Sequence, residues 1–143
     1  MRGTWRPKTL RGMRSLGRRL AARLSGGDVV ALVGDLGAGK TSFVQGLAEG
    51  LGVQDVASVV SPTYTLVNVY PAAGWALHHI DLYRLDSVAD AQALGIDEQL
   101  GCKDAICAVE WADRAVDIIP QHAFWVRIAF AATGRLVEFS GGA

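Results

Sequence analysis

Hydrophobic residues recur along this chain with spacings that change from segment to segment. Helical spacing over about residues 9–24 and again over 41–51 predicts two helices. The predicted strand at 28–33, apolar from Val29 onward, and the apolar run at 105–109 are typical of buried strands. Shorter hydrophobic runs predict four further strands, at residues 66–70, 75–80, 124–130 and 136–139. Helices that alternate with buried strands indicate an α/β domain.

Turn and capping residues set the boundaries between these elements. The turn at 71–74 joins two of the strands into an antiparallel hairpin. Ser87 and Asp90 resemble a capping box that begins a short helix, which Gly95 ends, and a second short helix follows at 97–100. We therefore predict a mainly parallel central sheet with antiparallel additions from the hairpin and the C-terminal strands, flanked by helices.

The composition suits a single compact domain. The chain has 143 residues, 50% of them hydrophobic, and no linker or change of composition divides it. No apolar run approaches the roughly 20 residues of a membrane span and no signal peptide is recognisable, so we expect a soluble, cytoplasmic protein. Cys102 and Cys107 lack companions at metal-site spacing, and we expect both to be reduced thiols.

Basic residues are concentrated at the start of the chain. The formal net charge is zero, yet eight of the 14 Lys and Arg residues precede the first acid, Asp28. Residues 1–8 are expected to be poorly ordered, and the folded domain is expected to span 9–143. The arginines of the first predicted helix suit a solvated charged face, contact with RNA or an acidic partner, or an organellar targeting peptide.

One loop carries a complete chemical motif. Residues 34–41 fit the phosphate-loop pattern G-x-x-x-x-G-K-[ST] at every required position, between a predicted strand and a predicted helix. Its glycines allow backbone N–H groups to wrap a triphosphate, and the helix directs its positive N-terminal end at the anion. Lys40 would contact the β- and γ-phosphates, and the Thr41 hydroxyl would bind Mg²⁺. The predicted nucleotide-binding residues of the loop are Asp35, Leu36, Gly37, Ala38, Gly39, Lys40, Thr41 and Ser42.

Two carboxylates follow apolar strands, at the position where an α/β sheet places ligand-binding groups. Glu110 ends the run 105–109 in a Walker B arrangement and can hold Mg²⁺ directly or through water. Asp81 can orient or deprotonate an attacking water, or act in the outer shell of the metal. With Lys40 they form the predicted catalytic set. The alternatives are a surface carboxylate for Glu110 and a helix cap or turn residue for Asp81.

Two further features lie near these residues in the sequence. His78 and His79 point to opposite faces of a strand, so at most one of them joins Asp81. We expect His79 to have a structural or hydrogen-bonding role, with a role in the nucleotide site as the alternative. Ser61 and Thr63 offer hydroxyls on a proline-stiffened loop that is suited to sensing a γ-phosphate, although a plain turn has the same composition.

Four segments in this order closely resemble the TsaE (YjeE) family: the phosphate loop, residues 61–66, residues 79–85 and residues 109–111. The resemblance extends over about residues 16–139. It implies a small P-loop ATPase, using ATP and Mg²⁺, that is needed for the threonylcarbamoyl modification of adenosine 37 in tRNAs. The positions that match the family are Lys40 and Thr41 for phosphate and Mg²⁺, Glu110 for the Walker B acid, Asp81 for the HxD aspartate, and Ser61 and Thr63 for the switch-like loop.

The resemblance also implies partners. In that family the TsaD and TsaB proteins transfer the threonylcarbamoyl group, and the ATPase hydrolyses ATP to let the cycle continue. Contact with tRNA is expected through this complex, and direct contact is left open. The arginine-rich start departs from the family, which usually has a Ser or Thr and acidic lead-in there, so no adenine contacts are assigned.

Two other functions are compatible with a phosphate loop. A small-molecule phosphotransferase generally needs a cationic lid, and few Lys or Arg residues are available for one outside the loop and the N-terminal segment. A GTP-driven switch would need a guanine-reading N-K-x-D sequence, which this chain lacks. Both remain as alternatives to the partner-dependent ATPase.

Overall fold

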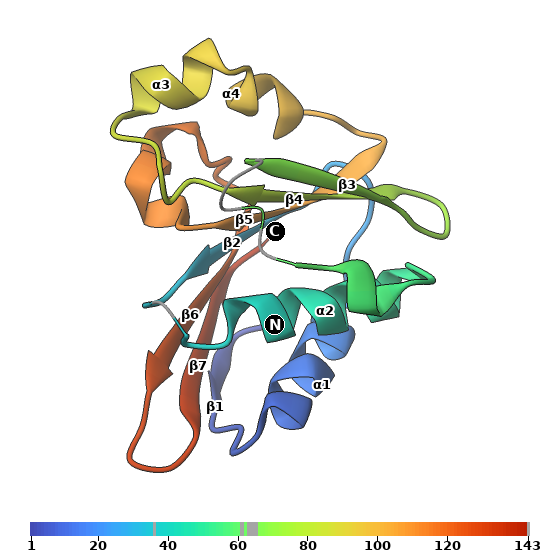
Figure 1. Cartoon of the computed structure of the whole chain (residues 1–143), viewed down its shortest axis with the longest axis vertical. Helices are drawn as coiled ribbons and strands as arrows, with labels where there is room; N and C mark the ends of the chain where they lie inside the picture. The colour runs from blue at the N-terminus through green and yellow to red at the C-terminus, as the bar shows by residue number, and fades with distance from the viewer. Residues whose placement is uncertain (36, 61, 63–65, 143) are drawn as a thin grey trace.

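A computed structural model of the chain describes residues 1–35, 37–60, 62 and 66–142, and in it helices alternate with strands (Figure 1). The strands are β1 Gly3–Trp5, β2 Val29–Val33, β3 Val67–Pro71, β4 Ala76–Asp81, β5 Ala105–Glu110, β6 Phe124–Phe130 and β7 Arg135–Gly141. The α-helices are α1 Leu10–Ala21, α2 Lys40–Leu51, α3 Val88–Ala93 and α4 Ile96–Gln99. Short 3₁₀ helices cover Val56–Ser58 and Ala112–Ile118.

The strands form one mixed sheet in the order β1-β7-β6-β2-β5-β4-β3. At its centre β2 pairs in parallel with both β5 and β6, and β5 pairs in parallel with β4. The pairs β1–β7, β6–β7 and β3–β4 are antiparallel. The predicted fold, a parallel centre with antiparallel additions from the hairpin and the C-terminal strands, is confirmed.

Both faces of the central strands are buried, and each face belongs to a separate core. In β2, Val30 and Leu32 belong to a core shared with α1 and α2, whereas Val29 and Ala31 belong to a core shared with α3 and α4. Figure 1 shows the two pairs of helices on opposite sides of the sheet. Alternation along a strand sends successive side chains to opposite faces, which explains why the central strands are apolar throughout.

Helix α1 packs closely against α2 and holds it on the sheet. Its buried stripe begins at Met13, while Thr9 caps the helix by accepting a hydrogen bond from the Gly12 N–H at 3.0 Å. The two helices meet backbone to backbone at Gly46, where a Cβ would lie 1.9 Å from the Arg14 carbonyl oxygen. The predicted N-terminal helix is confirmed, and it supports the helix that follows the phosphate loop.

The start of the chain differs from the sequence-based expectation. Residues 3–5, expected to be poorly ordered, form β1 and pair with β7, placing Thr4 opposite Glu138. The Trp5 ring packs edge-on against Phe139 with centroids 5.0 Å apart. Residues 3–5 are held because Trp5 packs on Phe139, which is far away in the sequence. The many arginines of this segment do not indicate such a contact. Within the described residues, every helix is too short or too polar to cross a bilayer.

Candidate functional site

The phosphate loop lies at the carboxyl end of β2, where the chain enters α2. Gly39 is the residue before α2 and has φ of 113°, a conformation that favours glycine. Ala38 beside it is buried, whereas Gly37 is exposed. The strand, loop and helix predicted around this motif are confirmed, and the predicted nucleotide contact Leu36 lies outside the described residues.

Lys40, the first residue of α2, is buried and turns its side chain back over the loop. Its ammonium donates to the backbone oxygens of Gly34 and Asp35, the second at 2.9 Å, and lies 4.4 Å from the centre of the Trp111 ring. Burial lowers the pKa of Lys40, and nearby carboxylates, led by that of Glu110, act in the opposite direction. The loop therefore presents a desolvated cation beside acidic side chains.

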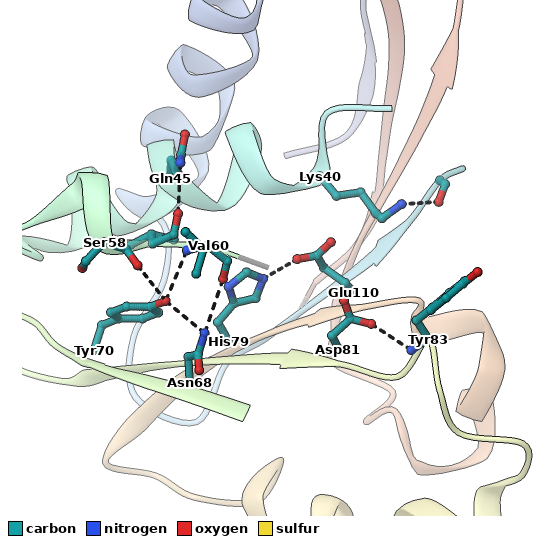
Figure 2. Close-up of polar contacts among 12 residues, drawn as sticks. Lys40, Gln45, Ser58, Val60, Asn68, Tyr70, His79, Asp81, Tyr83 and Glu110 are labelled. Atoms are coloured by element: carbon teal, nitrogen blue, oxygen red, sulfur yellow. Dashed lines mark hydrogen bonds and ion pairs between the residues drawn. The ribbon is translucent and has the colours of Figure 1, made fainter. Parts of the chain in front are cut away.

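Glu110 and Asp81 lie side by side, as register partners at the ends of the parallel strands β5 and β4. Glu110 is 3% exposed, and a carboxylate oxygen contacts Nε2 of the fully buried His79 (Figure 2). Nδ1 of His79 has no hydrogen-bond partner among the residues that the structure describes. The sequence predicts that at most one of the two histidines joins Asp81. In the structure His79 contacts Glu110, the register partner of Asp81, so its predicted hydrogen-bonding role is present.

Asp81 also shapes the turn after β4. Its Oδ1 accepts a hydrogen bond from the Tyr83 N–H at 2.8 Å, so the turn role left open by the sequence is present. The Tyr83 ring packs on Trp111 with centroids 4.9 Å apart, and the Arg114 guanidinium lies 5.3 Å from the Tyr83 ring. Trp111 has φ of 58°, a conformation that is uncommon for bulky residues and is found at functional sites. The Trp111 ring that contacts Lys40 is therefore packed against a second aromatic ring, that of Tyr83.

A second cation reaches the loop from the last part of the chain. Arg135, the first residue of β7, donates from Nε to the Ala38 carbonyl at 2.8 Å and from a terminal nitrogen to the Gly37 carbonyl at 3.2 Å. Its guanidinium also lies 4.4 Å from the centre of the Phe130 ring. Sequence reasoning missed this residue, because 97 positions separate Arg135 from Ala38 and no local pattern links them.

The segment that follows α2 is tied to the site on both sides of the predicted switch loop. Gln45 of α2 donates to the Val59 carbonyl at 3.0 Å, and the Leu66 carbonyl accepts from the Asp81 N–H at 2.9 Å. The structure therefore links this segment to the phosphate-loop helix and to an acidic site residue. The predicted nucleotide contacts in the switch loop, Ser61 and Thr63, lie outside the described residues.

The described residues at this edge include groups of the kinds that phosphate and Mg²⁺ bind, the Lys40 ammonium and the Glu110 carboxylate. In residues 1–35, 37–60, 62 and 66–142, no group of three or more His, Cys, Asp or Glu side chains is placed to hold a metal ion. Mg²⁺ in phosphate sites commonly takes one or two protein oxygens and completes its shell with phosphates and water, so the two predicted ligands, Thr41 and Glu110, have a suitable number and chemistry. Ser42, a predicted nucleotide contact in the first turn of α2, lines a cavity of about 410 Å³ whose other lining residues belong to α1 and to later turns of α2.

Fold and loop together define the class of protein, an α/β domain of the phosphate-loop type. The model of the family described as "Threonylcarbamoyl adenosine biosynthesis protein TsaE" matches residues 8–137. The chain belongs to the TsaE family of tRNA threonylcarbamoyladenosine biosynthesis proteins.

Similar proteins of known family cover most of the chain. The tRNA threonylcarbamoyladenosine biosynthesis protein TsaE of Borreliella burgdorferi is 40% identical over 116 residues, which cover 80% of this chain and 82% of that protein. The protein of the same name from Streptomyces coelicolor is 42% identical over 118 residues, covering 81% and 78%. The crystal structure of Bacillus subtilis YdiB matches with a TM-score of 0.78 at 31% identity, covering 100% of this chain and 87% of that one.

Proposed function

We infer that this TsaE-family protein binds ATP with Mg²⁺ and hydrolyses it, in support of threonylcarbamoyladenosine formation in tRNA by the TsaD and TsaB proteins. One observation carries the ATPase proposal. Lys40, Glu110 and Asp81 converge at the carboxyl edge of adjacent parallel strands, beside a complete phosphate loop. Ligands of open α/β sheets bind at this edge, so the three charged groups lie where a nucleotide would meet them.

Lys40 would change partners when the nucleotide binds. Its ammonium now donates to the Gly34 and Asp35 carbonyl oxygens, and phosphate oxygens are stronger acceptors for it. Because Lys40 is buried beside the Trp111 ring, its attraction to a phosphate is screened less than it would be in water. The anion would also favour the protonated amine, opposing the burial that lowers the pKa of Lys40.

The acidic residues would have separate roles in binding Mg²⁺ and in activating water. Thr41 and Glu110 would hold Mg²⁺, which neutralises charge on the phosphates when it is bound. The contact with His79 keeps the Glu110 carboxylate in one orientation, as outer-shell groups do for metal-binding side chains. Asp81, next to Glu110 across the strands, would orient the attacking water or accept its proton.

The test compares hydrolysis by the protein alone with hydrolysis in the presence of TsaD, TsaB and tRNA. We expect Lys40→Ala to lose ATP affinity, because it removes the cation of the loop. Asp81→Asn and Glu110→Gln should still bind ATP but hydrolyse it about 100-fold or more slowly, because they act on the water and the metal. Binding is measured by calorimetry and hydrolysis by phosphate release.

The outcome of the same assay separates the alternatives. Stimulation by TsaD, TsaB and tRNA that Glu110→Gln abolishes would support a partner-gated ATPase. A phosphorylated small molecule in place of free phosphate would contradict hydrolysis and favour a phosphotransferase. Competition in which GTP displaces ATP at equal concentration would contradict the choice of adenine nucleotide. Normal turnover by Asp81→Asn with the partners present would remove Asp81 from the mechanism.

A further inference from the structure

A basic cavity lies at the beginning of the chain, away from the phosphate loop. It has a volume of about 650 Å³, and its lining residues are Met1, Arg2, Trp5, Arg19, Arg23, Phe124, Gly141 and Gly142. Three arginines therefore face one space with two aromatic residues, and none of the described residues that line it is acidic. We call these three arginines and Trp5 the N-terminal basic cluster.

The arginines of this cluster have no ion-pair partner among the residues that the structure describes. Glu49 pairs with two other arginines of α1, Arg14 and Arg18, at 3.6 and 3.5 Å. Within the described part of the chain, Arg19 and Arg23 form no ion pair. Both are exposed. The positive charge of the cluster is therefore available to an anionic ligand.

The aromatic ring of the cluster, that of Trp5, is held in place. The Trp5 ring packs edge-on against Phe139 with centroids 5.0 Å apart and remains partly exposed. The Arg19 guanidinium lies 5.6 Å from the centre of the Trp5 ring. A packed ring with the Arg19 guanidinium beside it, in a cavity that Arg2 and Arg23 also line, offers stacking to a flat base and charge-assisted hydrogen bonds to phosphate.

We propose that the N-terminal basic cluster binds RNA directly, with the arginines on the phosphate backbone and Trp5 against a base or sugar. An acidic polypeptide would use the charges but would leave the ring without a flat partner, whereas a nucleic acid uses both. The family's role in tRNA threonylcarbamoyladenosine biosynthesis makes tRNA the relevant RNA. The proposal does not depend on ATP hydrolysis.

The cluster and the nucleotide site lie at opposite ends of the parallel strands. Phe124 begins β6 and pairs with Gly141 near the end of the antiparallel strand β7, so the cavity opens at the amino edge of the parallel strands. The phosphate loop follows the carboxyl end of β2, at the opposite edge. RNA held by the cluster would leave the phosphate loop free for ATP.

The experiment measures binding of an unmodified, fluorescently labelled tRNA transcript to the full chain by anisotropy over a range of salt concentrations. We expect the double variant Arg19→Gln/Arg23→Gln to bind about tenfold or more weakly and to lower the slope of log K against log salt by about 1 to 2, as expected for lost phosphate contacts. Arg2→Gln, which changes one exposed side chain, should cause a smaller loss in the same direction.

The matched control is Arg11→Gln/Arg127→Gln, which removes the same charge from two exposed positions outside the cavity. This variant should bind tRNA nearly as well as the original protein. Equal losses in the two double variants would overturn the proposal, because net charge alone would then explain binding. Absence of binding by the original protein would also overturn it, as would displacement of the tRNA by polyglutamate of similar total charge. ATP affinity measured in each variant verifies the fold independently.

Discussion

Charged and polar side chains are rarely buried without a partner, and this chain buries several at one place. Among the described residues the buried ones are Lys40, His79, Asp81 and Glu110. Burying such groups costs free energy unless each is paired, and here Glu110 meets His79 while Lys40 meets loop carbonyls. Hydrophobic residues in their place would pack with less cost. Their clustering at the carboxyl edge supports the proposed nucleotide site.

Arg135 provides a prediction at the scale of a single residue. Its planar guanidinium donates hydrogen bonds to the carbonyls of both Ala38 and Gly37. A lysine ammonium cannot reproduce this pair of bonds. Arg135→Lys should therefore loosen the loop before the nucleotide arrives. We expect a loss of about 1–2 kcal/mol in ATP binding, which is roughly five- to thirtyfold in affinity. Calorimetric titration with ATP measures it.

The control for Arg135 is another arginine on the neighbouring strand. Arg127 of β6 is exposed and lies 5.7 Å from the centre of the Trp125 ring, outside the loop. Arg127→Lys should leave ATP affinity unchanged. An Arg135→Lys protein with the original affinity, or equal losses in both variants, would show that Arg135 does not position the loop.

At the scale of elements, the position of the phosphate-loop helix depends on its contact with α1. The two helices approach so closely that Gly46 faces the Arg14 carbonyl directly. This contact leaves no room for a side chain, so the pair is held by backbone packing and by the shared core below it. The phosphate loop leads directly into α2, so the orientation of the loop depends on how α2 packs against α1.

Gly46→Ala should therefore destabilise the fold. The added Cβ would lie 1.9 Å from the Arg14 oxygen, so the helices must separate, and overpacking of this kind costs about 1–3 kcal/mol or more. Thermal unfolding followed by circular dichroism measures the change. Gly101→Ala is the control, because the nearest atom to its Cβ would be 3.5 Å away, and its melting temperature should stay close to the original. An unchanged melting temperature for Gly46→Ala would contradict the close packing.

At the scale of the whole molecule, the core on each face of the sheet gives the two cysteines different exposure to solvent. Cys107 of β5 is buried between the sheet and the helices of one face, and Cys102 is partly exposed. Burial raises the pKa of the Cys107 thiol to about 12. Ionisation of this thiol would therefore need strongly alkaline conditions or unfolding.

The prediction concerns thiol reactivity at pH 8. With a pKa about four units above that pH, Cys107 carries a thiolate fraction on the order of 1 in 10,000, so an aromatic disulfide reagent should modify Cys102 and leave Cys107 intact. Unfolding in guanidinium should expose the second thiol. Cys102→Ser should abolish the reaction of the folded protein, and rapid reaction of that variant would mean that the core opens readily.

Local sequence determined the elements that carry the loop. Residues that lie next to one another can be read together, so the spacing of glycines around Lys40 and the apolar run before Glu110 predict where the cation and the acid stand. The same applies to α1, whose buried stripe follows from helical periodicity. Alternation along β4 also showed that at most one of His78 and His79 lies with Asp81.

Tertiary structure alone decided which of these residues meet. β5 lies between β2 and β4 in the sheet, and this order places Glu110 beside Asp81 and within reach of His79. Arg135 reaches the loop from the last strand, and Trp5 finds Phe139, because strands distant in the sequence are neighbours in the sheet. Periodicity reports which face of an element is buried, but strand order depends on how all the elements pack together, which no local pattern encodes.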